Sequence, residues 1–187
     1  EIRIRGKRFK SLNPVKSVDE GIQVIYQDLS LFPNLSVSEN IAISEYNREN
    51  WRPVNRRKMS KIATEAMQRI NVSIKPGKLV RELSVAQKQV VAITRAIATD
   101  AELIIMDEPT ASLSKHEIDE LLKLIKRLQR KGLTIVFVSH KLDEIMSVSE
   151  RVTILRDGNK IGTFSADTLD DQKIAKLMTG KEYTNKR

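Results

Sequence analysis

The feature that most constrains the fold is a strand–helix–strand pattern between residues 103 and 140. "LIIM" (103–106) is too short for a helix and is uniformly apolar, as a parallel strand covered on both faces should be. Ser114-x-x-Glu117 predicts the start of a helix, whose apolar residues recur at helical spacing until Gly132. "LTIVFVSH" follows as a second buried strand. Because a helix connects the two strands, they should be parallel, which predicts an α/β fold.

Polar residues stand where these strands end. Asp107 and Glu108 follow the first strand directly, and His140 ends the second. The carboxyl ends of parallel strands share one sheet edge, which is where open α/β sheets bind ligands. If the β-branched run "IQVIYQ" joins the same sheet in parallel, Gln27 arrives at this edge too. Carboxylates in this position are typical of a magnesium site that serves a nucleotide phosphate.

The loop that usually cradles such phosphates is absent from the sequence. It has the form G-x-x-x-x-G-K-[ST]. The Gly-Lys pairs of this chain lack both the upstream glycine and the following Ser or Thr: Gly6-Lys7, Gly77-Lys78 and Gly180-Lys181. We expect the phosphate-gripping half of the site to lie upstream of Glu1. A natural truncation and a trimmed chain both remain open as explanations, and we predict that the 187 residues alone are inactive.

A run of helical signals separates "IQVIYQ" from the second part of the predicted sheet. Ser36-x-x-Glu39 is a capping box, and "NRRKMSKIATEAMQRI" places apolar residues at helical spacing. "ELSVAQKQVVAITRAIA" predicts a largely apolar helix with Ser84 as its N-cap and Gln87 at the capping-box position. A helix that opens in this way is suited to binding an anion.

These signals predict three regions. Residues 1–35 form a sheet portion that ends near Gln27, and residues 36–97 form a helical subdomain. Residues 98–187 form the sheet core, followed by a hairpin around Asp157-Gly158 and a last helix.

Composition narrows the function classes. A chain of 187 residues suits one domain with a small subdomain, and no apolar run approaches the roughly 18 residues of a membrane-spanning helix. The net charge of +9 makes nucleic acid or an anionic membrane surface a candidate partner. The densest basic region, residues 48–61, fits either a loop and helix face exposed to solvent or a segment near anionic lipid. Only 4% of the residues are aromatic, which disfavours a base-stacking platform. Without cysteines, disulfides and thiolate metal sites are excluded.

Taken together, the motifs resemble those of the nucleotide-binding subunits of ABC transporters. Gln27 in "VIYQDLSLFPNLSVSENI" resembles the Q-loop glutamine, "LSVAQKQ" stands at the place of the LSGGQ signature, and "LIIMDEP" resembles Walker B. "TASLS" is similar to the D-loop, and His140 in "VFVSHKLDEI" is similar to the switch histidine. The details are most similar to the first cassette of tandem ATP-binding proteins in bacterial ribose/galactose-type sugar importers. The resemblance implies a partial P-loop NTPase (RecA-like) parallel sheet with an inserted helical subdomain.

The resemblance implies roles for the residues at the sheet edge. Asp107 would coordinate Mg²⁺ through water, with Gln27 as a second ligand, and Glu108 would orient the attacking water. His140 would contact the γ-phosphate, and Gln27 would sense that phosphate and the metal. Each residue also has a plainer explanation. Asp107 could be an aspartate that caps a helix or forms a turn after a strand, His140 a buried histidine with a hydrogen bond, and Gln27 a polar residue at a strand end.

Other residues would face a nucleotide that a second cassette holds, so their role exists only in a pair. They are Ser84, Val85, Ala86, Gln87 and Ser114. The chain departs from the family pattern here: Val85 and Ala86 replace the signature glycines, and Ser114 replaces the D-loop aspartate. Such side chains restrict the backbone where phosphate must approach closely. The missing phosphate loop is the more serious departure for activity.

The leading hypothesis is an ATP-driven, Mg²⁺-dependent importer cassette for a sugar, peripheral at the cytoplasmic face of the membrane. Its partners would be a second ATP-binding cassette, transmembrane permease subunits and, indirectly, a periplasmic sugar-binding protein. Leu31, Phe32 and Pro33 are candidates for touching the permease or for packing within the helical subdomain. Under this hypothesis we expect no nucleic acid among the partners. One alternative is a soluble ABC-type ATPase that acts on nucleic acid or ribosomes. Another is a non-catalytic fragment.

Overall fold

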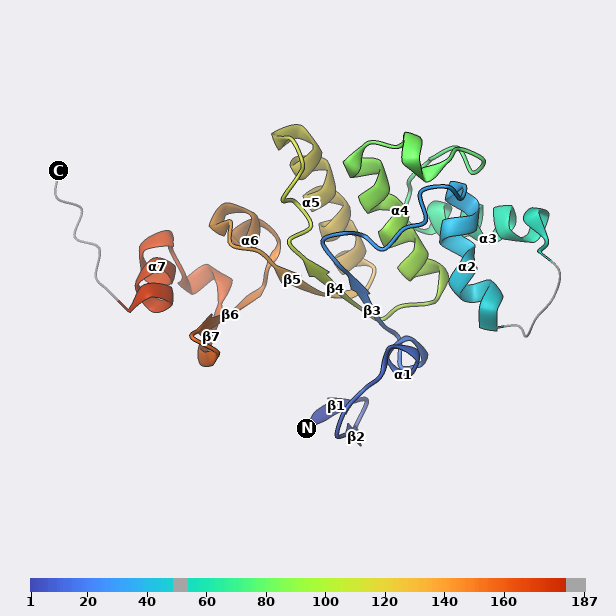
Figure 1. Ribbon diagram of the computed structural model, residues 1–187. Helices are drawn as coiled ribbons and strands as arrows, with labels where there is room; N and C mark the ends of the chain where they lie inside the picture. Colours follow the sequence, from blue (N-terminus) through green and yellow to red (C-terminus); the bar gives the residue numbers. More distant parts are fainter. Residues whose placement is uncertain (49–53, 181–187) are drawn as a thin grey trace. The chain divides into compact units, whose positions relative to one another are not determined.

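A computed structural model describes residues 1–48 and 54–180 of the chain (Figure 1). The backbone divides into two compact units, Glu1–Val138 and the part that begins at Ser139. None of the helices in the described ranges combines the length and the apolar content that a membrane crossing needs.

The first unit is built on a parallel three-stranded sheet. Its strands β3 (Ile22–Ile25), β4 (Leu103–Asp107) and β5 (Thr134–Val138) lie in the order β3-β4-β5. Both neighbouring pairs are parallel. The predicted parallel pairing of the two apolar runs is therefore confirmed, as is the arrival of "IQVIYQ" in the same sheet. The fold class is α/β, as the sequence predicts.

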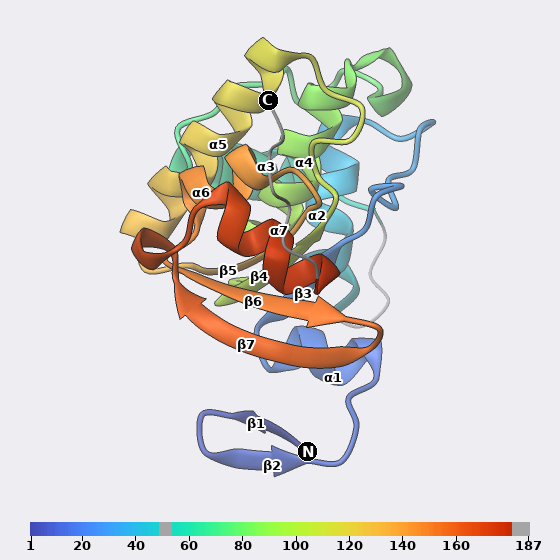
Figure 2. The ribbon, with the colours of Figure 1, turned by 90° about the vertical axis from the view of Figure 1, so that its left-hand side faces the viewer.

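Two helices cover one face of this sheet. Helices α4 (Val85–Ala98) and α5 (Lys115–Arg130) contact β3 and β5 respectively and lie on one side of the strands (Figure 2). In β4, Ile104 and Met106 have no exposed surface, whereas Val136 and Val138 of β5 are each 45% exposed. The expectation that the second apolar run is a buried strand is thus wrong for these two residues of β5. A continuous apolar run shows that a strand suits an apolar environment, but it does not say which neighbours supply it.

The described residues between 36 and 97 form helices and loops. They comprise α2 (Val37–Arg48), α3 (Arg56–Arg69), the 3-10 turn η1 (Val80–Glu82) and most of α4. A separate apolar core joins them, made of Val37, Ile41, Ala63, Ala66, Met67, Val80, Leu83 and Val91. No strand occurs among the described residues of this segment, as predicted. The limits of the three predicted regions stay predictions.

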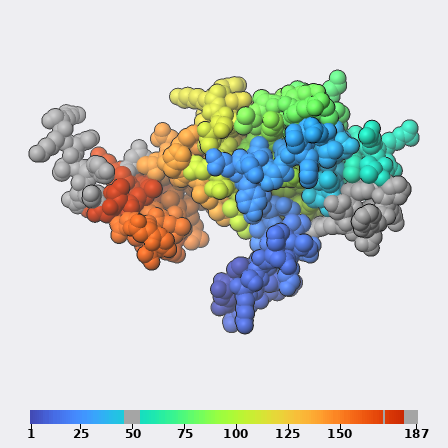
Figure 3. Space-filling model, in the orientation of Figure 1, coloured from blue at the N-terminus to red at the C-terminus, as the bar shows by residue number. Residues whose placement is uncertain are grey.

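The chain begins with a small hairpin. Strands β1 (Ile2–Ile4) and β2 (Lys7–Phe9) pair antiparallel and project from α1 (Pro14–Asp19) (Figure 1, Figure 3). The turn is tight because Arg5 and Gly6 both have positive φ, 46° and 80°. Asn13 caps α1 by accepting a hydrogen bond from the Lys16 N–H at 2.8 Å.

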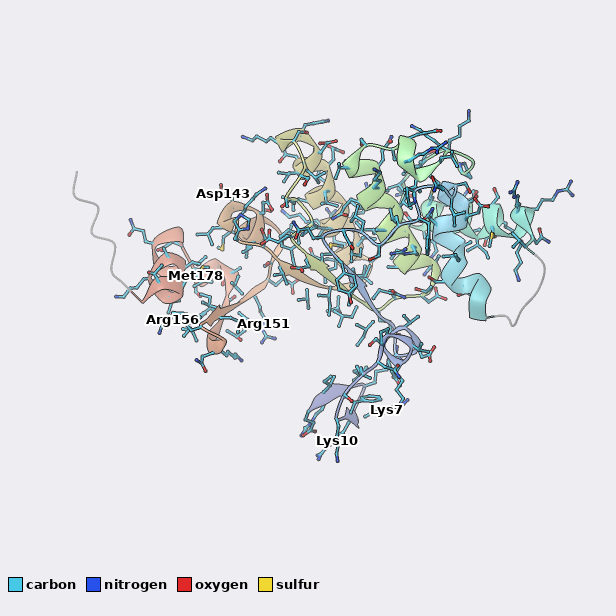
Figure 4. The ribbon with its side chains drawn as sticks, in the orientation of Figure 1. Lys7, Lys10, Asp143, Arg151, Arg156 and Met178 are labelled. Atoms are coloured by element: carbon cyan, nitrogen blue, oxygen red, sulfur yellow. The ribbon has the colours of Figure 1, made fainter. Side chains whose placement is uncertain are left out.

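The second unit contains helix α6 (Leu142–Val148), the antiparallel strands β6 (Arg151–Arg156) and β7 (Asn159–Ser165), the turn η2 (Ala166–Thr168) and helix α7 (Asp171–Thr179). The predicted hairpin is confirmed, with Asp157 and Gly158 both at positive φ. Arg156, labelled in Figure 4, donates a hydrogen bond to the Leu177 carbonyl at 3.4 Å and so ties the hairpin to α7. The last helix ends at Gly180, whose φ is 72°.

Candidate functional site

The carboxyl ends of the three strands define the candidate site. Asp107 is the last residue of β4 and lies beside Val138, the last residue of β5. Ile25, the last residue of β3, lies beside Met106, and Gln27 follows it by two positions. The side chains of Asp107 and Gln27 are exposed. The fold therefore brings a carboxylate and a carboxamide to the same sheet edge, which the sequence predicts.

Glu108 stands in a strained turn directly after β4. Its φ is +46°, a conformation that residues other than glycine seldom adopt. The Glu108 N–H donates a hydrogen bond to the Val138 carbonyl at 2.9 Å, so the neighbouring strand holds the turn. The residue is half-buried. Strained backbone at a carboxylate is the kind of feature that clusters at active sites.

His140 belongs to the second unit. It follows the end of β5 by two residues and is exposed. Its predicted place beside Asp107 and Glu108 stays a prediction, because those two residues belong to the first unit.

The signature segment begins α4 with a complete capping box. Ser84 Oγ accepts a hydrogen bond from the Gln87 N–H at 3.2 Å, and Gln87 Oε1 accepts one from the Ser84 N–H at 3.3 Å. Both side chains act as acceptors in these bonds. The hydroxyl hydrogen of Ser84 and the amide hydrogens of Gln87 therefore remain able to donate to an anion. Val85 is 44% exposed and Ala86 is half-buried at the same helix end.

Ser114 also caps a helix, but unlike Ser84 its hydroxyl donates a hydrogen bond within the cap. Its hydroxyl donates to Glu117 Oε2 at 2.8 Å, and its N–H donates to the same oxygen at 2.9 Å. These bonds lower the pKa of Glu117 from its ordinary value, because they favour the carboxylate. The observed role of Ser114 is therefore to cap α5, and its predicted contact with a nucleotide stays a prediction.

The oxygen donors at the edge suit a hydrated magnesium ion. No group of three or more His, Cys, Asp or Glu side chains that could hold a metal occurs in the described ranges. Asp107 and Gln27 offer two oxygen donors from adjacent strands. Mg²⁺ is commonly bound by one or two protein ligands together with water and substrate phosphates. The donor set therefore fits Mg²⁺ that arrives with a nucleotide.

Sequence reasoning missed two polar residues of α4. Gln89, which is 3% exposed, donates through Nε2 to the Pro109 carbonyl at 2.9 Å, directly after Glu108. Arg95 donates to the Ser30 carbonyl at 2.8 Å and to the Leu29 carbonyl at 3.2 Å, in the turn that follows Gln27. A signal was present, because both polar residues fall within the apolar run that follows the first turn of the helix.

A cavity of about 310 Å³ lies apart from the sheet edge. It is lined by residues of α4, α5 and the adjacent loops, among them Ser84, Gln89, Leu113 and Arg127. Gln27, Asp107 and Glu108 do not line it. The cavity is therefore not formed by the polar residues at the sheet edge.

Curated relatives match nearly the whole chain. "Ribose import ATP-binding protein RbsA" of Burkholderia pseudomallei is 40% identical over 187 residues, which cover 98% of this chain and 36% of that protein. "Ribose import ATP-binding protein RbsA 3" of Rubrobacter xylanophilus is 40% identical over 186 residues, with 99% and 37% covered. The chain thus spans little more than a third of the length of these relatives.

Solved structures share the fold. The chain is similar to cbiO1 from Clostridium perfringens, described as part of the ABC transporter complex cbiONQ, with a TM-score of 0.71 and 23% identity. That match covers 87% of this chain and 65% of the other. A second similar structure is MJ1267, an ATP-binding cassette of an ABC transporter, with a TM-score of 0.70 and 22% identity over 88% and 67% of the two chains. The family model described as ABC transporter matches residues 1–111, more than half of the sequence, so the chain belongs to the ABC transporter family.

Proposed function

We propose that this chain is part of an ATP-binding cassette that couples ATP hydrolysis to the import of a sugar. The observation that carries the proposal is the parallel register that gathers Gln27, Asp107 and Glu108 at one sheet edge. The ribose importer names of relatives that match 98% or more of the chain support the choice of substrate class.

In this proposal each residue at the edge has one task. Asp107 and Gln27 hold Mg²⁺, which would neutralise charge on the transferred phosphate. Glu108 accepts a hydrogen bond from a water molecule and aims it at the phosphate, while His140 donates to the γ-phosphate oxygen. Ser84 and Gln87 donate to a nucleotide held by a second cassette, and Val85, Ala86 and Ser114 border it.

We further propose that the phosphate-gripping loop comes from a segment outside these 187 residues. The sequence contains no G-x-x-x-x-G-K-[ST] motif, and Asp107 reaching Mg²⁺ through water is a weak hold by itself. The 187-residue chain should therefore show neither tight Mg-ATP binding nor measurable turnover. Calorimetry on this chain and on a full-length protein that contains it tests this, because micromolar affinity in the short chain would reveal an unrecognised phosphate site.

The partners and the location follow from the same proposal. The full-length protein would work in a pair of cassettes on transmembrane permease subunits, at the cytoplasmic face of the membrane. A periplasmic sugar-binding protein would deliver the sugar and would not contact the cassette.

Reconstituted transport tests the function. The full-length protein is placed with its permease subunits in lipid vesicles, and uptake of pentoses and hexoses is measured with ATP and with a non-hydrolysable ATP analogue. The proposal expects uptake of at least one of these sugars with ATP only, together with sugar-stimulated phosphate release. Salt-dependent retention of RNA by the protein, with no uptake of any sugar, would favour a nucleic-acid function instead.

A further inference from the structure

The turn that follows Gln27 contains two residues in an unfavourable backbone conformation. Leu29 has a φ of 62° and Ser30 a φ of 43°, and neither is glycine. Leu29 is buried, so the turn cannot relax by moving its side chain into water at no cost. Such conformations persist only where the surrounding structure holds them.

Two side chains hold this turn. The carboxylate of Asp28 accepts hydrogen bonds from the Ser30 N–H at 3.2 Å and from the Ser30 hydroxyl at 3.0 Å. From α4, Arg95 donates a hydrogen bond through Nη1 to the Ser30 carbonyl at 2.8 Å and another through Nη2 to the Leu29 carbonyl at 3.2 Å. One planar group thus grips the two carbonyls of the two strained residues. The planar fork of an arginine is suited to this, whereas a lysine offers one compact point charge.

Placing the charged Arg95 side chain where it is partly buried costs free energy, because the guanidinium loses contact with water. The residue is half-buried, and burial lowers the pKa of its guanidinium from the ordinary value. Among the described residues, no carboxylate forms an ion pair with Arg95; its donors go to neutral carbonyls. An apolar residue would suit the packing of an apolar helix better. The cation is therefore best explained by what it holds.

Arg69 shows the ordinary use of an arginine at a carbonyl. It donates to the Ile97 carbonyl at 3.0 Å near the end of α4 and pairs with Asp100 at 2.8 Å. Its side chain is 54% exposed. This contact closes a helix end and touches no residue of the candidate site, which makes Arg69 a matched control.

We propose that Arg95 is a positioning residue for Gln27, which ties the turn after Gln27 to the same helix that carries Ser84 at its N-terminus. The inference rests on the proposed role of Gln27 in ATP hydrolysis. Helix α4 is 14 residues long without a break, and half of its residues are buried, so Ser84 and Arg95 are joined by one continuous helix. Through Arg95, a shift of the signature end of α4 relative to the sheet is transmitted to Gln27.

The first test compares arginine variants in the full-length protein with its permease. Arg95→Gln should lower kcat for ATP hydrolysis about tenfold or more, since misplacing a positioning contact is costly. The KM for ATP should change little, because the phosphate-gripping loop lies elsewhere. Arg95→Lys keeps the positive charge but cannot donate to both carbonyls from one planar group. Its kcat should therefore lie between that of Arg95→Gln and that of the unchanged protein. Arg69→Gln should keep kcat unchanged.

A double-mutant cycle separates positioning from simple loss of stability. If Arg95 acts through Gln27, Arg95→Gln should cause no further loss in a Gln27→Ala background. Ser30→Gly, which removes the penalty for positive φ, should restore part of the activity of Arg95→Gln. Independent, multiplying losses in the cycle, or an equal loss in Arg69→Gln, would overturn the proposal.

Hydrogen exchange tests the contact without relying on activity. Amides of residues 28–31 should exchange about tenfold faster or more in Arg95→Gln and Arg95→Lys than in Arg69→Gln, because the held turn opens more often. Unchanged exchange in both Arg95 variants would refute the inference even if ATP hydrolysis were slowed. If exchange responds and Gln27→Ala hydrolyses ATP normally, the proposed role of Gln27 fails while the contact stands.

Discussion

At the scale of single residues, the candidate site depends on where strands end. Asp107 and Gln27 were predictable because a side chain at the end of a parallel strand must lie at the ligand-binding edge. The strained backbone of Glu108 and Leu29 was not predictable from the sequence. Glycine is the residue that usually indicates a positive φ, and neither residue is a glycine. The same holds for Arg95, whose partners are backbone carbonyls more than sixty positions away.

Asp107→Asn tests the metal site at this scale. Loss of the negative charge should raise the free Mg²⁺ concentration required for half-maximal hydrolysis by about tenfold, the lower end of the usual cost of disturbing a metal site. The measurement is phosphate release by the full-length protein over a range of free Mg²⁺. Asp119→Asn, the same change at an exposed position of α5, serves as the control. An unchanged Mg²⁺ requirement in Asp107→Asn would remove this carboxylate from the metal site.

At the scale of elements, the capping boxes were the most reliable sequence signals. The motifs that begin with Ser36, Ser84 and Ser114 all form the expected bonds at the start of a helix. A capping box is local, so the sequence alone contains the whole interaction. Burial of a strand is not local, and the expectation that β5 is buried was wrong for Val136 and Val138. The domain limits likewise depend on contacts between distant segments.

Ser84→Ala and Ser36→Ala form a matched pair. Each change removes a cap, so each should destabilise its helix by about 1 kcal/mol. Only Ser84 is proposed to donate to a nucleotide, so only Ser84→Ala should also lower kcat/KM for ATP hydrolysis by the paired full-length protein. Urea unfolding and steady-state hydrolysis measure the two effects. Equal activities in the two variants would contradict the proposed hydrogen bond from Ser84 to a nucleotide, and only its role as a helix cap would stand.

The cap of α2 should depend on pH. Glu39 Oε2 accepts hydrogen bonds from the Ser36 hydroxyl at 2.6 Å and from its N–H at 2.8 Å, and these bonds lower the pKa of Glu39 below its ordinary 4.5. A carboxylate with a lowered pKa adds stability above the unfolded value and loses it as the pH falls through the folded value. Glu39→Gln should therefore destabilise the chain at pH 7, and the difference should shrink below pH 4.5. Urea unfolding across this range checks it, and a difference that grows on acidification would contradict it.

At the scale of the whole molecule, fold and family were predictable because ordered motifs cover most of the chain. The sheet, the helices between residues 36 and 97 and the final hairpin all follow from apolar patterns and turn residues. The predicted placement of His140 beside the carboxylates stays a prediction, because His140 belongs to the second unit and Asp107 and Glu108 to the first. The net charge of +9 gave the least guidance, since it suits both an anionic membrane surface and nucleic acid.

The central claim is that the edge with Glu108 hydrolyses ATP. The most direct measurement is phosphate release under saturating Mg-ATP by the full-length protein and its Glu108→Gln variant, with Glu120→Gln as the control on an exposed carboxylate of α5. The account predicts that Glu108→Gln keeps ATP binding, slows hydrolysis by orders of magnitude and accumulates an ATP-bound pair of cassettes, because the attacking water loses its acceptor. A Glu108→Gln variant that hydrolyses ATP at the normal rate would contradict it.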